Sequence, residues 1–254
     1  MAKALFQQRL VWWPTTLGWC CILLVPGVLF GTWFFFGESF LSETRRVPAE
    51  TLIVEGWIGR EALPFTKQEF ERGGYKRLIV TGGLTGHTWA RERWSVTEIA
   101  QRDLLKLGFP EDNLVLAPCD DVENQRTYVS ALAALRTMSR QGWQAQGINV
   151  ISRGPHARRT HSVYAKVFGS HVAVGVISWN PYASHGRAWW RSSTRAKELL
   201  DETFGWSYEA GFHSGRDPVV WRSWIIVLMT GVALFVIWRK GRAVVKRNRN
   251  AHAY

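Results

Sequence analysis

Cysteine is scarce in this sequence, and the three cysteines present cannot build a disulfide framework. Cys20 and Cys21 are adjacent within a long apolar stretch, and Cys119 stands alone in the middle of the chain. A lone cysteine cannot form an internal disulfide, and no Cys-x-x-Cys or His/Cys cluster has the spacing of a metal site. We therefore expect a fold that rests on a hydrophobic core, without a metal ligand set.

Two further absences narrow the class of protein. No Gly-x-Ser-x-Gly motif occurs, so the nucleophile elbow of the α/β-hydrolases is excluded. No internal repeat or low-complexity tract occurs either, which excludes a repeat architecture. The residues also point to no particular cofactor.

Charged residues are missing from two long stretches near the ends of the chain. Residues 10–37 contain none, and this stretch exceeds the roughly 20 residues that cross a bilayer. Residues 223–238 also contain none, and residues 219–221 extend them, because the side chain of Arg222 can reach the lipid headgroups. We predict two transmembrane helices, 10–37 and 219–238. A cleaved signal peptide and a processed C-terminal sorting signal are the competing interpretations.

Positive charge is concentrated outside the middle of the chain. Residues 38–217 carry 23 Lys and Arg against 20 Asp and Glu, so they supply only +3 of the net charge of +12. Basic residues follow the second apolar stretch directly, at Arg239, Lys240, Arg242, Lys246, Arg247 and Arg249. By the positive-inside rule, both termini are cytoplasmic and the middle domain lies outside the cytoplasmic membrane. The basic charge thus indicates a lipid partner and no nucleic acid.

Between the apolar stretches, short β-rich runs alternate with helical patterns. We predict strands at 51–57, 77–83, 113–117, 148–151 and 171–177. We predict helices at 60–72, 95–108, 127–138, 156–168 and 193–204. This alternation predicts an α/β fold, a Rossmann-like doubly wound and mainly parallel sheet of about five strands, flanked by the two transmembrane helices. The predicted order is a cytoplasmic N-terminus at 1–9, a span at 10–37, a linker at 38–50, the α/β domain at 51–208, a linker at 209–218, a span at 219–238 and a basic cytoplasmic tail at 239–254.

The stretch from Ile148 to Arg159 is the most informative part of the domain. An apolar strand ends at Ser152, a Gly-Pro turn follows, and His156 and Arg159 open a helix. The N-terminus of a helix favours anions, and an arginine and a histidine there strengthen this preference. Three cations at that helix end, His156, Arg158 and Arg159, would be a poor choice for stability alone. We therefore predict an anion site, in which His156 orients the anion or transfers a proton.

Other predicted strands also end in polar or flexible residues, and parallel strands end at one common edge of the sheet. The candidate catalytic groups are Glu55, Glu98, Asp121 and His156. The candidate substrate-binding residues are Thr81, Gly82, Gly83, Arg126, Thr127, Ser152 and Arg159. Some of them have plainer interpretations, since Gly82 and Gly83 could form an ordinary turn, Glu98 could cap its helix with Ser95, and Asp121 could be a loop carboxylate.

In their order along the chain, these residues resemble the YdcF-like family, a group of bacterial envelope proteins that includes SanA-like and ElyC-like members. The resemblance covers residues 51–208. It depends on Thr81-Gly82-Gly83, on the helix start from Ser95 to Ala100 with Glu98, on Arg126-Thr127, and on Ser152 to His156 followed by Arg159. The resemblance implies a Rossmann-like fold and, for membrane-anchored members, a role in envelope integrity, peptidoglycan or lipid-carrier metabolism.

Two functions stay open on these residues. The first is a membrane-anchored envelope protein that binds, or also transforms, a phosphorylated lipid-linked substrate at the outer face of the membrane. The second is a non-catalytic interaction subunit of a membrane protein complex. Four tryptophans lie in predicted loops: Trp57, Trp179, Trp189 and Trp190. They could line an apolar part of a substrate, insert into the membrane interface or pack within the domain, and the sequence does not separate these roles.

Overall fold

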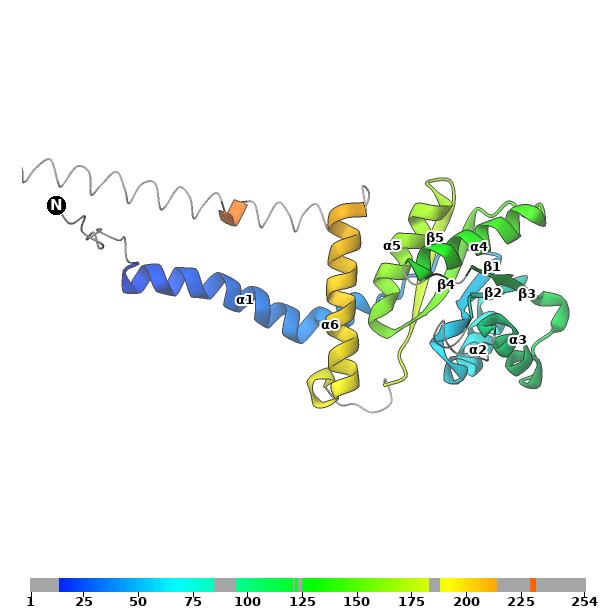
Figure 1. Ribbon diagram of the computed structural model, residues 1–254, viewed down its shortest axis with the longest axis horizontal. Helices are drawn as coiled ribbons and strands as arrows, with labels where there is room; N and C mark the ends of the chain where they lie inside the picture. The colour runs from blue at the N-terminus through cyan, green and yellow to red at the C-terminus, as the bar shows by residue number, and fades with distance from the viewer. Residues whose placement is uncertain are drawn as a thin grey trace, which may run out of the picture.

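Five strands form one sheet at the centre of the domain, in the order β3-β2-β1-β4-β5 (Figure 1). The computed structural model describes residues 14–84, 95–120, 122, 125–182, 188–213 and 229–231. Every neighbouring pair of strands is parallel, which confirms the predicted α/β class. The sheet is fully parallel, beyond the mainly parallel one expected. Its strands are β1 (Thr51–Glu55), β2 (Arg77–Gly82), β3 (Leu114–Pro118), β4 (Gly147–Arg153) and β5 (Ala173–Trp179).

Helices cover both faces of this sheet, as a doubly wound fold requires. On one face lie α2 (Leu63–Gly73) and α3 (Val96–Lys106). On the other lie α4 (Arg126–Arg140) and α5 (Ala157–Phe168). The chain runs outward from β1 through β2 to β3, returns through α4 to β4, and continues to β5. The winding therefore reverses between β1 and β4, and this boundary is the topological switch point.

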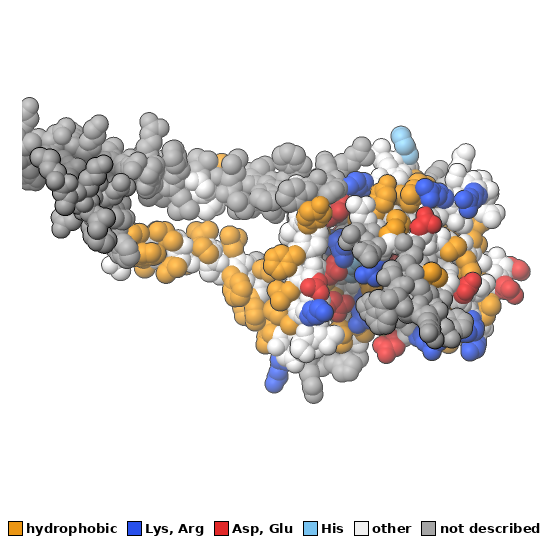
Figure 2. All heavy atoms as spheres, viewed as in Figure 1, with side chains coloured by type: hydrophobic (Ala, Val, Ile, Leu, Met, Phe, Trp, Pro, Cys, Tyr) orange, Lys and Arg blue, Asp and Glu red, His pale blue; other side chains and the backbone are white. Residues whose placement is uncertain are grey.

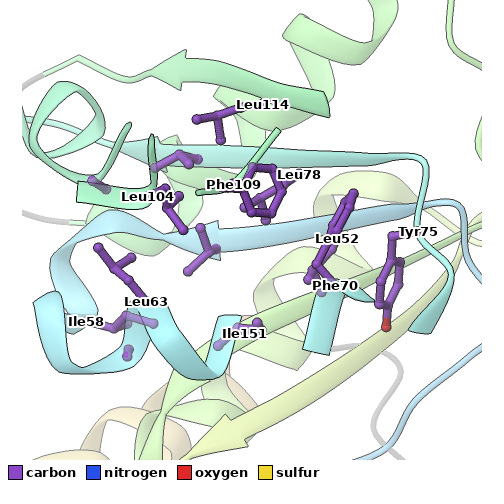
Figure 3. Packing of buried hydrophobic residues seen from close by; sticks show 14 of the residues in the cluster. Leu52, Ile58, Leu63, Phe70, Tyr75, Leu78, Leu104, Phe109, Leu114 and Ile151 are labelled. Atoms are coloured by element: carbon purple, nitrogen blue, oxygen red, sulfur yellow. The ribbon is translucent and has the colours of Figure 1, made fainter. Parts of the chain in front are cut away.

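The core consists of two apolar layers, one on each face of the sheet. Figure 3 shows the first layer, in which Leu52 and Leu78 of the strands meet Leu63, Phe70 and Leu104 of the helices. Neighbouring residues of a strand point to opposite faces, so Ile53 and Ile79 join α4 and α5 in the second layer. Complete burial of a leucine or isoleucine stabilises the fold by about 1.5–3 kcal/mol. Burial on both faces explains why the strands lack alternating polarity.

Most predicted elements appear within a few residues of their expected bounds. The first strand ends at Glu55 and not at residue 57, because Gly56–Ile58 forms a 3₁₀ turn. Helix α3 has the predicted cap, since the Ser95 hydroxyl accepts a hydrogen bond from the Glu98 N–H at 3.4 Å. Helix α2 ends at Gly74, whose φ of 65° lies in the left-handed region that glycine allows without strain.

One helix within the described residues is long and apolar enough to cross a membrane, α1 (Thr16–Leu41). The sequence predicts two such helices, but of residues 219–238 only 229–231 are described, so the rest of that prediction lies outside the described residues. Helix α1 continues four residues beyond the predicted end of the first span. Its last turns pack on α6 (Ser193–Tyr208), where a hydrogen bond of 3.2 Å joins Trp33 Nε1 to Thr203 Oγ1.

Candidate functional site

A buried carboxyl group lies at the switch point of the sheet. Glu55 is the last residue of β1, and its Oε2 accepts hydrogen bonds from Ser152 Oγ of β4 at 2.8 Å and from Thr160 Oγ1 of α5 at 3.3 Å. All three side chains are fully buried. The other carboxyl oxygen, Oε1, is also buried and has no hydrogen-bond partner among the described residues. Ligands of open α/β sheets bind at this position, beyond the carboxyl ends of the strands.

Burial makes Glu55 a weaker acid than an exposed glutamate. Removal from water raises the pKa of Glu55 above its ordinary value, and this effect outweighs the opposing charge of His156 and the hydrogen bonds from Ser152 and Thr160. The protonated carboxyl group is therefore favoured more strongly than in an exposed glutamate. A neutral Glu55 carries an O–H, which can serve as a hydrogen-bond donor or as a proton source.

The imidazole of His156 is held between two oxygen atoms. His156 follows β4 in the turn Gly154–His156 and is 6% exposed. Its Nδ1 lies 2.9 Å from Glu202 Oε1 of α6, and its Nε2 lies 3.2 Å from Thr127 Oγ1 of α4. The edge of the Trp57 ring system also meets the imidazole, with ring centroids 4.9 Å apart. Helices α4 and α6 and the turns after β1 and β4 thus fix one orientation of the ring.

Glu202 is the anionic centre of the cluster. Arg159 donates to both of its carboxylate oxygens, at 2.8 Å from Nε to Oε2 and 2.9 Å from Nη2 to Oε1. Burial alone would raise the pKa of Glu202, but the hydrogen bonds and charges of His156 and Arg159 outweigh it and lower this pKa to about 2. Glu202 is therefore ionised at neutral pH. Nδ1 of His156 lies beside both members of this pair, at 2.9 Å from Glu202 Oε1 and 3.0 Å from Arg159 Nη2.

The guanidinium of Arg159 is shared between Glu202 and His156, since its Nη2 also lies 3.0 Å from His156 Nδ1. The Arg159 side chain is 31% exposed, and it lies along the backbone of α6 at Gly205. A Cβ on Gly205 would stand 3.2 Å from Arg159 Nε, so glycine permits this close approach. A second pair borders the cluster, since Arg153 Nε donates to Glu198 Oε1 at 3.0 Å.

Thr81 and Gly82 end strand β2, and Thr81 lies opposite Glu55 of β1 in the parallel register. The Thr81 hydroxyl donates to the Ser130 carbonyl at 3.2 Å. Gly82 has a φ of 152°, and a Cβ there would stand 2.2 Å from Val96 Cγ2. The carbonyls of Gly82 and Gly83 accept hydrogen bonds from the N–H groups of Cys119 and Val96. Close packing therefore accounts for the glycine at position 82.

The remaining candidates divide in a simple way. Ser152, His156, Arg159 and Thr127 meet in the cluster around Glu55 and Glu202. Glu98 is exposed in the first turn of α3, and Arg126 is exposed at the first residue of α4. Asp121 lies outside the described residues.

Two members of the cluster were not predicted from the sequence. Thr160 stands one helical turn after His156, so helix periodicity could have indicated it. Glu202 is 46 residues from His156 along the chain and is one of several acidic residues of its helix. Only the packing of α6 against the turn after β4 distinguishes it, and no local pattern reports that packing.

A separate hollow of about 440 Å³ lies between β3 and α4. Apolar residues such as Val115 and Leu132 line it together with Arg136 and Arg140, and no member of the buried cluster does. Within the described residues, no three His, Cys, Asp or Glu side chains gather as a metal site would require.

The order of groups in the cluster is a hydroxyl, an imidazole and a carboxylate. Thr127, His156 and Glu202 form this series, in which the carboxylate orients the ring and the ring can accept a proton from a hydroxyl or a substrate. Arg159 adds a cation whose side chain is partly exposed. The site can therefore hold an anion and move a proton beside it. No protein-family model matches the sequence, and no curated protein matches it significantly.

Proposed function

We propose that this chain is a membrane-anchored bacterial cell-envelope protein that binds a phosphorylated substrate, related to lipid carriers or peptidoglycan, at the outer face of the cytoplasmic membrane. The observation that carries the proposal is the cluster of Glu55, His156, Arg159 and Glu202 at the switch point. Burial of three ionisable groups, Glu55, His156 and Glu202, costs folding free energy, so a cluster of this kind is more typical of a functional site than of a stabilising core.

Arg159 is the main anchor for the anion in this proposal. A guanidinium presents several N–H donors in one plane and binds phosphate in a bidentate manner. Glu202 holds one edge of Arg159, so the exposed edge faces the ligand in a fixed orientation. His156 contributes the second contact, and its Nε2 takes or returns a proton if the phosphate ester is transformed.

The anchoring part of the proposal depends on the ends of the chain. Helix α1 is apolar enough for a span, and the second apolar stretch with its basic tail supplies the second span. Both termini are then cytoplasmic by the positive-inside rule. The resemblance to the YdcF-like family supports the same assignment of the domain to the cell envelope.

A binding measurement on the full chain in lipid nanodiscs tests the proposal. The probe is farnesyl phosphate, a short prenyl phosphate, and the variants are Arg159→Gln and Arg159→Lys. We expect Arg159→Gln to weaken binding about tenfold or more, because a charge-assisted hydrogen bond contributes about 1.5–3 kcal/mol. Arg159→Lys keeps the positive charge but loses the planar guanidinium. We therefore expect its affinity to lie between those of the wild type and Arg159→Gln.

The matched control is Arg136→Gln, since Arg136 is an exposed arginine on α4. We expect this variant to bind like the wild type. Wild-type affinity in a folded Arg159→Gln protein would contradict the proposal. So would equal losses in both variants, because a general loss of positive charge would then explain them.

A further inference from the structure

Helix α6 carries an exposed apolar stripe on the side away from the buried cluster. Leu200, Phe204 and Tyr208 are spaced four residues apart, and they are 52%, 72% and 58% exposed. Residues at this spacing lie on one face of a helix. Hydrophobic side chains gather on the surface where α1 meets the domain (Figure 2). An exposed apolar patch of this kind marks an interaction surface.

Helix α6 crosses the end of the apolar span. It runs across the direction of α1 (Figure 1), and it contacts α1 between Trp33 and Glu38. The Arg195 guanidinium lies 2.6 Å from Glu38 Oε1, and Glu38 is the first charged residue after Arg9. At 1.5 Å per residue, the 26 residues of α1 span about 39 Å, which exceeds the roughly 30 Å of bilayer hydrocarbon. The end of α1 that α6 crosses therefore corresponds to the level of the bilayer surface.

Aromatic side chains also gather where the turn Trp189–Arg191, just before α6, meets α1. Phe34 stacks on Trp190, with ring centroids 4.8 Å apart, and Trp189 Nε1 donates to the Phe34 carbonyl. Trp190 is 46% exposed, and Phe35 and Phe36 beside it are each 66% exposed. Tryptophan and tyrosine are enriched at the boundary between a membrane and water.

We propose that α6 lies flat in the membrane interface, with Leu200, Phe204 and Tyr208 in the bilayer beside α1. The proposal rests on the proposed function in one respect, namely that α1 crosses the membrane. Lipid is the occupant that fits, because α6 crosses α1 at the level of the bilayer surface, where Thr203 contacts Trp33 and Arg195 pairs with Glu38. Lys197 on the exposed side of α6 suits anionic headgroups.

This placement brings the buried cluster close to the membrane. Glu202 is two residues from both Leu200 and Phe204, so its side chain leaves the opposite side of α6. The cluster then stands about one helix diameter, roughly 10 Å, above the immersed stripe. A phosphate on a lipid chain could therefore reach Arg159 while its tail stays in the bilayer. The substrate class that follows is a lipid-linked phosphate rather than a free one.

Spin labels on the full chain in phospholipid vesicles test this placement. Single cysteines replace Phe204, Phe30 of α1 and Ser139 of α4 in a background in which Cys20, Cys21 and Cys119 are substituted. Each cysteine carries a nitroxide, and its collisions with oxygen and with a water-soluble nickel chelate are compared. Oxygen concentrates in lipid and the nickel chelate in water. We expect the label at 204 to resemble the one at 30, with an oxygen-to-nickel ratio severalfold above that at 139.

The other outcomes distinguish an error in the placement of α6 from an error in the membrane anchor. A label in water at 204 with a label in lipid at 30 overturns the placement of α6 and leaves the membrane anchor intact. Labels in water at both positions overturn the anchor as well. A label at 204 that is shielded from both relaxing agents overturns the placement in favour of a protein partner or a second copy on this face.

Discussion

Ser152 Oγ donates a hydrogen bond of 2.8 Å to Glu55 Oε2 across the boundary between β4 and β1, where the winding of the sheet reverses. The two strands are in register, with Val54 opposite Ile151, so the residues that follow this pair meet beyond it. The topology thus places a carboxyl group, a hydroxyl group and the first turn of α5 together. Single substitutions can change each of these groups separately.

Glu55→Gln is expected to leave the protein as stable as the wild type at pH 8, or more stable by about 1 kcal/mol. A glutamine keeps an oxygen for the Ser152 hydroxyl and removes a buried carboxyl group. Burial raises the pKa of Glu55, so at pH values between its unfolded-state and native-state pKa the native state binds more protons than the unfolded state. The stability contribution of Glu55 therefore falls as pH rises through its native pKa. Denaturant unfolding at pH 5 and pH 8 checks this, and a clearly less stable variant at pH 8 would contradict it.

Glu202→Gln is expected to reduce the free energy of unfolding by about 3 kcal/mol at pH 7. The substitution leaves His156 and Arg159 without their shared anion, and removal of one partner from a buried ion pair costs about 3–5 kcal/mol. The exposed neighbour Asp201 provides the matched control, since Asp201→Asn should change stability by less than about 0.5 kcal/mol. Urea unfolding of the three proteins in detergent measures the difference. Equal stabilities would show that the cluster is not held by Glu202.

The pH dependence of stability follows from the same carboxylate. The pKa of Glu202 is about 2 in the native state against 4.5 ordinarily, so its contribution is complete above pH 4.5 and is lost as pH falls toward 2. The loss is on the order of 3 kcal/mol. Wild type and Glu202→Gln should therefore approach each other in stability as the pH falls from 4.5 to 2. Parallel unfolding curves across this interval would rule out the low pKa.

Gly82→Ala and Gly83→Ala separate packing from ligand binding at the end of β2. At position 82 a Cβ would collide with Val96 Cγ2, and the φ of 152° strains any residue other than glycine. We expect a loss of about 3 kcal/mol. At position 83 the nearest atoms to a Cβ are 3.6 Å away, so stability should change by less than about 0.5 kcal/mol.

If the predicted anion cradle includes Gly83, the Gly83→Ala protein should bind farnesyl phosphate more weakly while it unfolds like the wild type. Calorimetric titration and thermal unfolding of the same samples measure both quantities. Wild-type affinity in Gly83→Ala would remove this turn from the site.

The α/β sheet and its helices could be predicted from the sequence because local patterns determine them. Apolar runs without alternation predicted buried parallel strands, and Ser95 before an apolar helix face predicted the cap of α3. The neighbourhood of Ser152, His156 and Arg159 could also be predicted, because all three lie in one strand-turn-helix unit. Contacts within such a unit are set by periodicity alone.

The partners of this unit could not be predicted, because they come from distant parts of the chain. Glu202 reaches His156 only because α6 packs on the turn after β4. The packing of α6 in turn depends on the end of α1, where Trp33 and Thr203 are 170 residues apart in sequence. Residue types offered no way to choose Glu202 over Glu198 or Asp201.

Photocrosslinking tests directly whether a prenyl phosphate binds at the cluster of Glu55, His156, Arg159 and Glu202. A prenyl phosphate that carries a photoreactive group near its phosphate is incubated with the full chain in nanodiscs, irradiated, and located by mass spectrometry of the peptides. We expect label on the segments around His156 to Arg159 and around Glu202, and we expect excess farnesyl phosphate to remove that label. Label confined to the hollow between β3 and α4, or label that farnesyl phosphate does not displace, would contradict binding at this cluster.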